Sequence, residues 1–208
     1  MAPFMNGDIV DPSHGKTEPA YPITSLGLDK YFTYHSHGED GLSNSLRAKV
    51  DLKAGQLIAY ITTHTPLKKP AWSSVQTGPN SHIELNSPML YINHSCAPNV
   101  EFRMVSPGAD GKYPSATEYP IREGEPVPTA GENGVAGELR VVADRDLKAG
   151  EDLSFFYPST EWNMGKPFKC LCDAPKDICL GQISGAEGVD REVLKKYSIN
   201  PHISAMLK

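Results

Sequence analysis

The feature that most constrains this chain is a polar tetrapeptide, NHSC at residues 93–96, enclosed by apolar residues. Residues 89–92 before it read MLYI, and residues 100–102 after it read VEF. A short apolar run of this kind is typical of a buried strand. A buried amide, imidazole or hydroxyl without a partner costs roughly 1 to 3 kcal/mol. The tetrapeptide therefore either meets polar partners from elsewhere in the chain or forms a plain strand-to-turn junction with the APN of residues 97–99.

The cysteines favour the first alternative. The chain of 208 residues has four of them, Cys96 in the tetrapeptide and Cys170, Cys172 and Cys179 near the C-terminal end. Four thiolates are the number that a closed tetrahedral zinc site needs. Two disulfides or four separate buried thiols are the alternatives. Disulfides need an oxidising compartment, and residues 1–11 have neither the basic start nor the apolar core of a signal peptide.

Length and charge limit the classes of function. The chain is long enough for one domain with a real core. Its net charge of −5 and the lack of basic clusters argue against direct nucleic-acid binding. An acidic surface suits a basic protein or peptide, although a charge of this size is also ordinary. No stretch approaches the length of a membrane span, so we expect an intracellular protein, cytoplasmic or nuclear.

Short apolar runs bounded by turn residues predict a mainly β protein. Residues 1–26, rich in proline, glycine and serine, predict an irregular arm. The pentapeptide DLKAG occurs at 51–55 and again at 146–150, which predicts two similar turns that end on glycine. Residues 190–197 predict a short helix with Asp190 as its N-cap. The expected strands are residues 46–50, 57–62, 83–85, 90–92, 100–104, 139–143 and 153–156.

Residues 105–138 form an unusually long connection, poor in large apolar residues and with five prolines and six glycines. Long connections in compact domains are either functional or disordered. We therefore expect either a mobile loop or a flap that shapes a substrate site, with Tyr113 and Tyr119 as its contact residues.

Three motifs in order resemble the SET domain and its post-SET cysteine segment, the fold of protein lysine methyltransferases. They are NHSC with Pro98, then GEDLSFFY at 150–157, then the C-terminal cysteines with Gly181. The resemblance covers about residues 27–184 and is closest to small fungal SET proteins. It implies several small β-sheets around a pseudoknot-like motif, a zinc-binding post-SET segment and a short terminal helix. The implied divisions are residues 1–26, 27–157 with the inserted loop, 158–184 and 185–208.

The resemblance also implies a chemistry, methyl transfer from S-adenosylmethionine to a lysine amine. Tyr157 would lie beside the sulfonium and the amine, and Tyr60 and Tyr91 are further candidates for the channel wall. Each aromatic residue has a purely structural alternative, as a core side chain. The implied cofactor contacts, which hold S-adenosylmethionine or the product S-adenosylhomocysteine, are Asn93, His94, Ser43, Ser45, Phe168 and Trp162, and the implied metal ligands are Cys96, Cys170, Cys172 and Cys179.

Three departures from the family pattern motivate a second hypothesis. Ser43 and Ser45 stand where the family has two glycines, and Phe156 replaces the usual acidic residue before the tyrosine. About 30 residues separate Tyr60 from Asn93, which leaves little room for the insert that holds a peptide substrate. The alternative is a repurposed SET-fold enzyme that acts on a small apolar molecule in a fungal biosynthetic pathway, as a cyclase, isomerase or other tailoring enzyme. A structural or interaction-only role is a third alternative.

Overall fold

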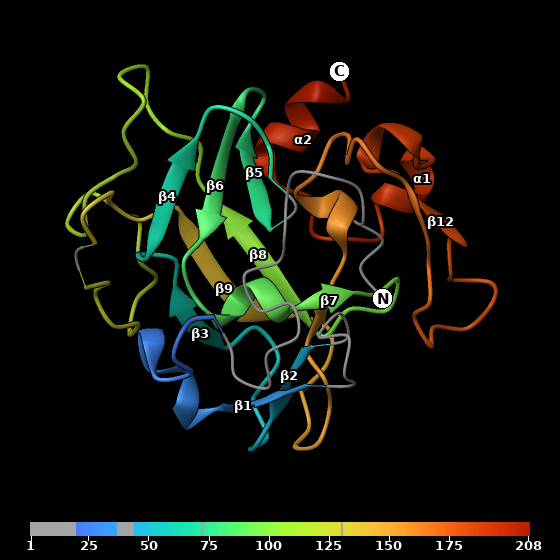
Figure 1. Cartoon of the computed structure of the whole chain (residues 1–208), viewed down its shortest axis with the longest axis horizontal. Coiled ribbons are helices and arrows are strands. Elements are labelled where there is room, and N and C mark those ends of the chain that lie inside the picture. The colour runs from blue at the N-terminus through green and yellow to red at the C-terminus, as the bar shows by residue number, and fades with distance from the viewer. Residues whose placement is uncertain (1–19, 37–43, 72, 130) are drawn as a thin grey trace.

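The computed structural model describes residues 20–36, 44–71, 73–129 and 131–208, so Ser43 and most of the N-terminal arm lie outside the described part. The described chain folds mainly into strands, arranged in five small sheets (Figure 1). The fold class predicted from the sequence is confirmed. The strands are β1 (Phe32–His35), β2 (Ser45–Ala48), β3 (Leu57–Tyr60), β4 (His64–Leu67), β5 (Ser74–Gly78), β6 (Ser81–Leu85), β7 (Asn93–His94), β8 (Val100–Met104), β9 (Gly137–Val141), β10 (Ser154–Phe155), β11 (Phe168–Lys169) and β12 (Gln182–Ile183).

The sheet β3-β9-β8 forms the centre of the core. Its strands are antiparallel, and β9 is buried along its whole length. Val100 and Leu139 are both fully buried. These strands are expected from their apolar residues, which alternate with Glu and Arg in β8 and β9, and the charged side chains between them are paired within the sheet.

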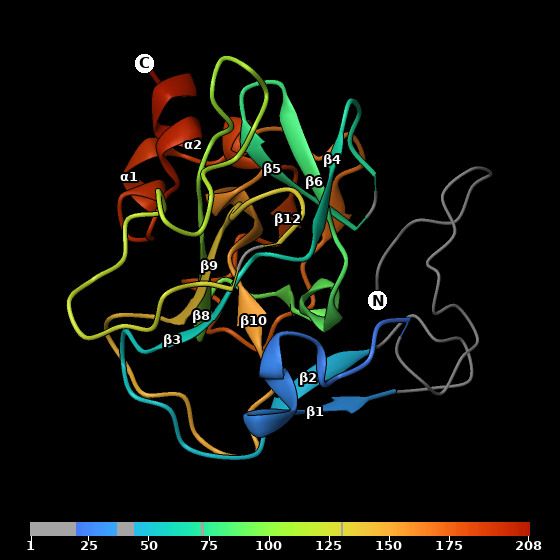
Figure 2. The same cartoon turned by 90° about the vertical axis from the view of Figure 1, so that its left-hand side faces the viewer.

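The sheet β4-β6-β5 lies above the sheet β3-β9-β8 in Figures 1 and 2, and α2 (Pro201–Met206) lies beside its strand β5. The sequence predicted β6 alone. The strand expected at residues 90–92 is wrong, because residues 88–91 form the 3-10 helix η2 (Pro88–Tyr91). Pro88 stands in its first turn, where the missing N–H costs nothing and the fixed φ favours a helix.

The C-terminal segment ends in helices that pack on the sheets. Asp190 caps α1 (Arg191–Leu194), accepting a hydrogen bond from the Glu192 N–H, so the predicted cap is confirmed while the helix is shorter than expected. The helix α2 (Pro201–Met206) was not predicted. Its N-cap Asn200 donates to the carbonyls of Phe102 and Ser159 and accepts from the Met104 N–H. Shorter 3-10 turns are η1 (Ser25–Lys30), η3 (Tyr157–Ser159) and η4 (Ala186–Gly188).

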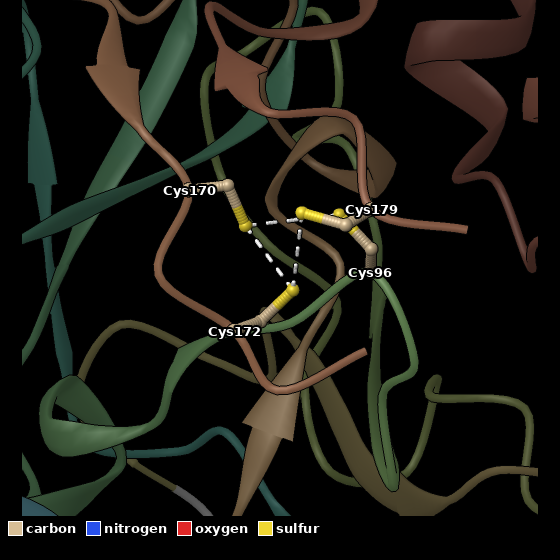
Figure 3. A group of neighbouring side chains, drawn as sticks. All are labelled: Cys96, Cys170, Cys172 and Cys179. Carbon is tan, nitrogen blue, oxygen red and sulfur yellow. Dashed lines mark hydrogen bonds between the residues drawn. The ribbon is translucent and has the colours of Figure 1, made fainter. Parts of the chain in front are cut away.

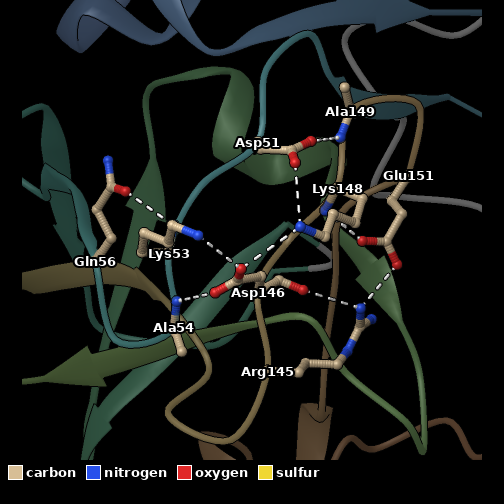
Figure 4. Close-up of polar contacts among 9 residues, drawn as sticks. All are labelled: Asp51, Lys53, Ala54, Gln56, Arg145, Asp146, Lys148, Ala149 and Glu151. Atoms are coloured by element: carbon tan, nitrogen blue, oxygen red, sulfur yellow. Dashed lines mark hydrogen bonds and ion pairs between the residues drawn. The ribbon is translucent and has the colours of Figure 1, made fainter.

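The two DLKAG turns bind each other (Figure 4). Asp51 accepts from the Ala149 N–H and pairs with Lys148, and Asp146 does the same with the Ala54 N–H and with Lys53. The backbones of the two turns also exchange hydrogen bonds between their leucines. Gly55 and Gly150 both have positive φ, as expected. The repeat thus forms one reciprocal clamp between distant segments.

The long connection between β8 and β9 is tied to the core by buried side chains. The Tyr113 hydroxyl lies 2.7 Å from Thr77 Oγ1 in β5, and the Tyr119 ring packs edge-on against Tyr60 in β3 at 5.4 Å. Both tyrosines are 7% exposed. Their burial makes them anchors of the loop, and contact of either tyrosine with a substrate stays a prediction.

Candidate active site and metal centre

The tetrapeptide lies where two distant segments pair in parallel. Asn93 and His94 form β7, which pairs with β10 in the register Asn93 to Ser154 and His94 to Phe155. The Ser95 N–H donates to the Phe155 carbonyl, which extends the pairing. β10 leads directly into Tyr157, so this pairing sets the polar tetrapeptide beside the proposed catalytic tyrosine.

Asn99 holds this junction together, a role beyond the turn formation that the sequence predicts for it. Its side chain accepts from the Ser154 N–H at 2.8 Å and donates to the Asp152 carbonyl at 2.8 Å. The residue is 3% exposed. A buried asparagine next to a buried strand was a signal that its amide needs partners.

The segment around Ser45 reaches the same place. Asn93 Nδ2 donates to the Asn44 carbonyl at 2.9 Å, and the buried Ser45 follows at the start of β2. The backbone of β2 pairs with residues 150–153 just before β10. The described part of the expected cofactor segment therefore adjoins Asn93.

Tyr157 is held by its backbone and by its hydroxyl. The hydroxyl donates to the Ile92 carbonyl at 3.3 Å, and the ring lies 4.6 Å from Phe155 and 6.1 Å from Phe168 between centroids. Burial, and then the negative charge of Glu161, raise the pKa of Tyr157 above the usual value of a phenol. The phenol is therefore neutral across the physiological pH range.

The His94 ring links Tyr157 to the cysteines. Its Nδ1 accepts from the Tyr157 N–H at 3.2 Å, and its Nε2 lies 3.4 Å from Cys96 Sγ. Burial lowers the pKa of His94 to about 4. A neutral imidazole that accepts at Nδ1 carries its proton on Nε2, so this N–H points at the Cys96 sulfur.

Three predicted site residues have packing contacts of their own, and their roles at the site stay predictions. Tyr91 packs edge-on against Tyr34 at 4.9 Å, and its hydroxyl accepts from the Ala20 N–H at 2.8 Å. Tyr60 lies under the long connection, in a different cluster from Tyr157. Trp162 packs with the C-terminal cluster around Phe156, which matches its structural alternative.

The four cysteines converge from two segments, and their side chains point toward one another in Figure 3. All four sulfur atoms lie within 4.8 Å of one another. Neighbouring sulfurs are 3.9 Å apart for Cys96 and Cys170, 3.2 Å for Cys170 and Cys172, and 3.8 Å for Cys172 and Cys179. A tetrahedron with metal–sulfur bonds of about 2.3 Å has edges of about 3.8 Å. All four are free thiols, so the group can hold one metal ion.

The surroundings favour one ionised thiol before any metal binds. Burial raises the pKa of Cys172, but hydrogen bonds from the Cys96 backbone N–H and from the Cys170 thiol outweigh it and lower that pKa to about 7. Burial raises the pKa of Cys96 to about 11. Tyr197 fixes this loop from the C-terminal side, because its hydroxyl donates to the Cys96 carbonyl at 2.8 Å.

The parallel β7–β10 pairing, the tyrosine that follows it and the converging cysteines define a SET domain with a post-SET segment. The sequence pattern of the SET domain family matches residues 44–158, and the chain belongs to this family. A curated relative is Methyltransferase flvH from Aspergillus flavus, 39% identical over 163 residues that cover 78% of this chain and 74% of the relative. In the described part of the chain, no helix has the length and apolar character needed to cross a membrane.

Proposed function

We propose that this protein is a methyltransferase that transfers a methyl group from S-adenosylmethionine to the side-chain amine of a lysine in a basic protein. The position of Tyr157 beside the β7–β10 pair is the observation that carries the proposal. Membership of the SET domain family and the name of the curated relative support methyl transfer in general.

The residues around Tyr157 suit a cationic sulfonium. Aromatic rings attract cations through their π faces, and Tyr157, Phe168 and the neutral His94 lie with ring centroids 5.2 to 6.1 Å apart. When bound, S-adenosylmethionine would supply the methyl group. Asn93, on β7 beside these rings, would be a polar contact for it.

Tyr157 would orient the amine through its oxygen. Its single hydroxyl proton is donated to the Ile92 carbonyl, so the oxygen is left to accept a hydrogen bond from the amine. Such orientation is a large part of catalysis in displacement reactions.

We also propose that the ion at the four cysteines is zinc. Four thiolates without a carboxylate or an open position are typical of structural zinc sites. The ion would hold residues 170–179 against Cys96 and thereby keep Phe168 beside His94.

Pure protein incubated with labelled S-adenosylmethionine and core histones, or with a cell lysate, tests the function. Label should appear in protein, at lysine. No transfer beside an active control enzyme would contradict the proposal.

For Tyr157→Phe, we expect methyl transfer to fall about 100-fold, the scale seen when one oriented polar group is removed from a reaction centre. Labelled transfer in single turnover measures the loss. Tyr31→Phe is the matched control, since Tyr31 lies outside the site and packs at the edge of the main core. Equal rates for the two variants would exclude a role of the Tyr157 oxygen.

A second candidate is transfer to a small apolar amine. Peptides often dock by adding a strand to an open sheet edge. On the outer edge of β5 the Gln76 N–H already donates to Glu161, and on the outer edge of β4 the His64 carbonyl already accepts from Asn133. A panel of small amines assayed beside histones distinguishes the two, because this candidate requires label in the amines alone.

A further inference from the structure

The turn that begins at Tyr157 has an N–H group that its own segment does not satisfy. The 3-10 turn η3 starts at Tyr157, and the residue before it, Phe156, makes no side-chain hydrogen bond to the turn. The first N–H groups of a helical turn have no partner within that turn. The ladder between β7 and β10 ends at Phe155. The Tyr157 N–H therefore needs a partner from another segment.

His94 supplies this partner. Its Nδ1 accepts a hydrogen bond from the Tyr157 N–H at 3.2 Å. A ring nitrogen that accepts in this way carries no proton, so the imidazole is neutral and its single N–H is at Nε2. The Tyr157 backbone thus fixes the tautomer of His94 and the direction in which the ring donates.

The Nε2–H group of His94 faces the metal centre. Nε2 lies 3.4 Å from Cys96 Sγ, and the Leu180 N–H donates to the same sulfur at 3.4 Å. Two N–H groups from different segments therefore converge on one metal ligand. Hydrogen bonds to an ionised acceptor are stronger than those to a neutral one, so both become stronger when Cys96 is a metal-binding thiolate. Such partners orient a ligand toward its metal ion.

The imidazole is fixed by its backbone and by the rings around it. His94 pairs with Phe155 in the ladder, and the N–H of the next residue, Ser95, donates to the Phe155 carbonyl. The ring packs against Tyr157 and Phe168, with centroids 5.2 and 5.9 Å away. A ring held in this way keeps each nitrogen on its own partner. One rigid side chain thus connects the metal centre with the tyrosine.

We propose that His94 is a positioning residue for both centres. Its Nε2–H group holds the Cys96 sulfur in place as a metal ligand, and its Nδ1 holds the turn that carries the Tyr157 hydroxyl. The role toward Tyr157 rests on the proposed function, whereas the role toward Cys96 requires only that the four cysteines bind a metal ion. Both roles are additional to the cofactor contact that the family resemblance implies for His94.

Two substitutions separate the two hydrogen bonds. In His94→Asn, the side-chain Oδ1 can take the place of Nδ1 and accept from the Tyr157 N–H, but the donor to Cys96 is lost. In His94→Gln, the side-chain Nε2 can take the place of the ring N–H and donate to Cys96, but the acceptor for Tyr157 is lost. Both variants lose the ring, so the difference between them measures the hydrogen bonds.

The first measurement is the rate at which the zinc-loaded protein releases zinc to an excess of chelator. We expect His94→Asn to release it about 10-fold faster than wild type, because the loss of a partner of a metal ligand lowers metal affinity by about 10- to 100-fold. His94→Gln should release zinc at close to the wild-type rate. His82→Asn is the control for the loss of an imidazole, since His82 lies on β6 in another sheet. It should also release zinc at the wild-type rate.

The second measurement follows Tyr157. In protein labelled with ¹⁵N at tyrosine, the amide resonance of Tyr157 is the one that is missing from Tyr157→Phe. Its proton resonance should move to higher field in His94→Gln, which lacks the hydrogen-bond acceptor, and stay near the wild-type position in His94→Asn. Single-turnover methyl transfer to core histones should be about 10-fold slower in His94→Gln than in His94→Asn, because small misplacements of a reacting group are costly.

The outcomes separate this proposal from the proposed function. If the wild-type protein transfers no methyl group, the proposed function fails, while zinc release and the Tyr157 resonance still test both hydrogen bonds of His94. Equal changes of the two variants in both measurements would overturn the proposal, because the loss of the ring would then explain them. It would also be overturned by a His94→Asn variant that releases zinc no faster than wild type, or by a His94→Gln variant with an unmoved Tyr157 resonance. A wild-type protein that binds no zinc would refute the role toward Cys96.

Discussion

Replacement of Cys172 by serine is expected to abolish metal binding and loosen the C-terminal segment. The sheet that holds this segment, β11-β12, has two residue pairs, so the chain around it depends on other links. Structural zinc sites of this type have apparent binding free energies of about 10 to 16 kcal/mol. A serine hydroxyl is a poor replacement for a thiolate at such a site. Metal analysis should find about one zinc per wild-type chain and almost none in the variant.

Hydrogen exchange of the C-terminal segment measures how far the loss of the metal loosens it. Hydrogen exchange should become faster from residue 168 to the C-terminus, while β8 and β9 keep their protection. Leu171→Ser is the matched control, because Leu171 lies between two of the ligands and is 64% exposed. It should keep its metal. Freshly purified, unchelated wild-type protein without zinc, or a Cys172→Ser variant that binds it fully, would exclude the centre.

Strands and helix caps could be predicted where the residues of one segment were enough to indicate them. The run at residues 100–104 is β8 to the residue, and Asp190 caps a helix as expected. The convergence of the cysteines could be predicted from their number, because one closed metal site needs four thiols. The strand wrongly predicted at residues 90–92 also has a local cause. The apolar run favours a strand, whereas Pro88 just before it favours the start of a helix.

The site was harder to predict because its contacts join distant segments. Gln76 and Glu161 are separated by 85 residues, and no pattern in either segment indicates the other. The same reason explains Tyr60 and Trp162, whose packing partners come from distant segments of the chain. The DLKAG repeat was recognised as two turns, but sequence similarity alone does not show that the two turns bind each other.

We expect Arg140 to hold the long connection between β8 and β9 to the core. It is 1% exposed and lies in β9. Its guanidinium donates to both carboxylate oxygens of Glu125 in the connection, to both of Glu138 in β9, and to the Gly55 carbonyl. All five N–H donors of an arginine are thereby used. The hydrogen bonds from Arg140 hold the pKa of Glu125 below its usual value.

Arg140→Met should lower the free energy of unfolding by about 3 to 5 kcal/mol, because two carboxylates then lack their buried partner. Denaturant unfolding measures the loss. Arg145→Met is the matched control: Arg145 is exposed and pairs with Glu151 at the surface, so its loss should cost well under about 1 kcal/mol. Similar losses in the two variants would contradict the prediction.

The sign of the pH dependence follows from Glu125. Its pKa is lowered in the folded protein, so the stability that it contributes is complete above the ordinary glutamate pKa and is lost as the pH falls through the lowered value. The difference between wild type and Arg140→Met should therefore narrow in acid. Adding Glu125→Gln and Glu138→Gln to Arg140→Met should restore part of the stability at pH 7, since no unpaired buried charge then remains. If the triple variant is no more stable than Arg140→Met, lost packing and not the unpaired charge is the cause.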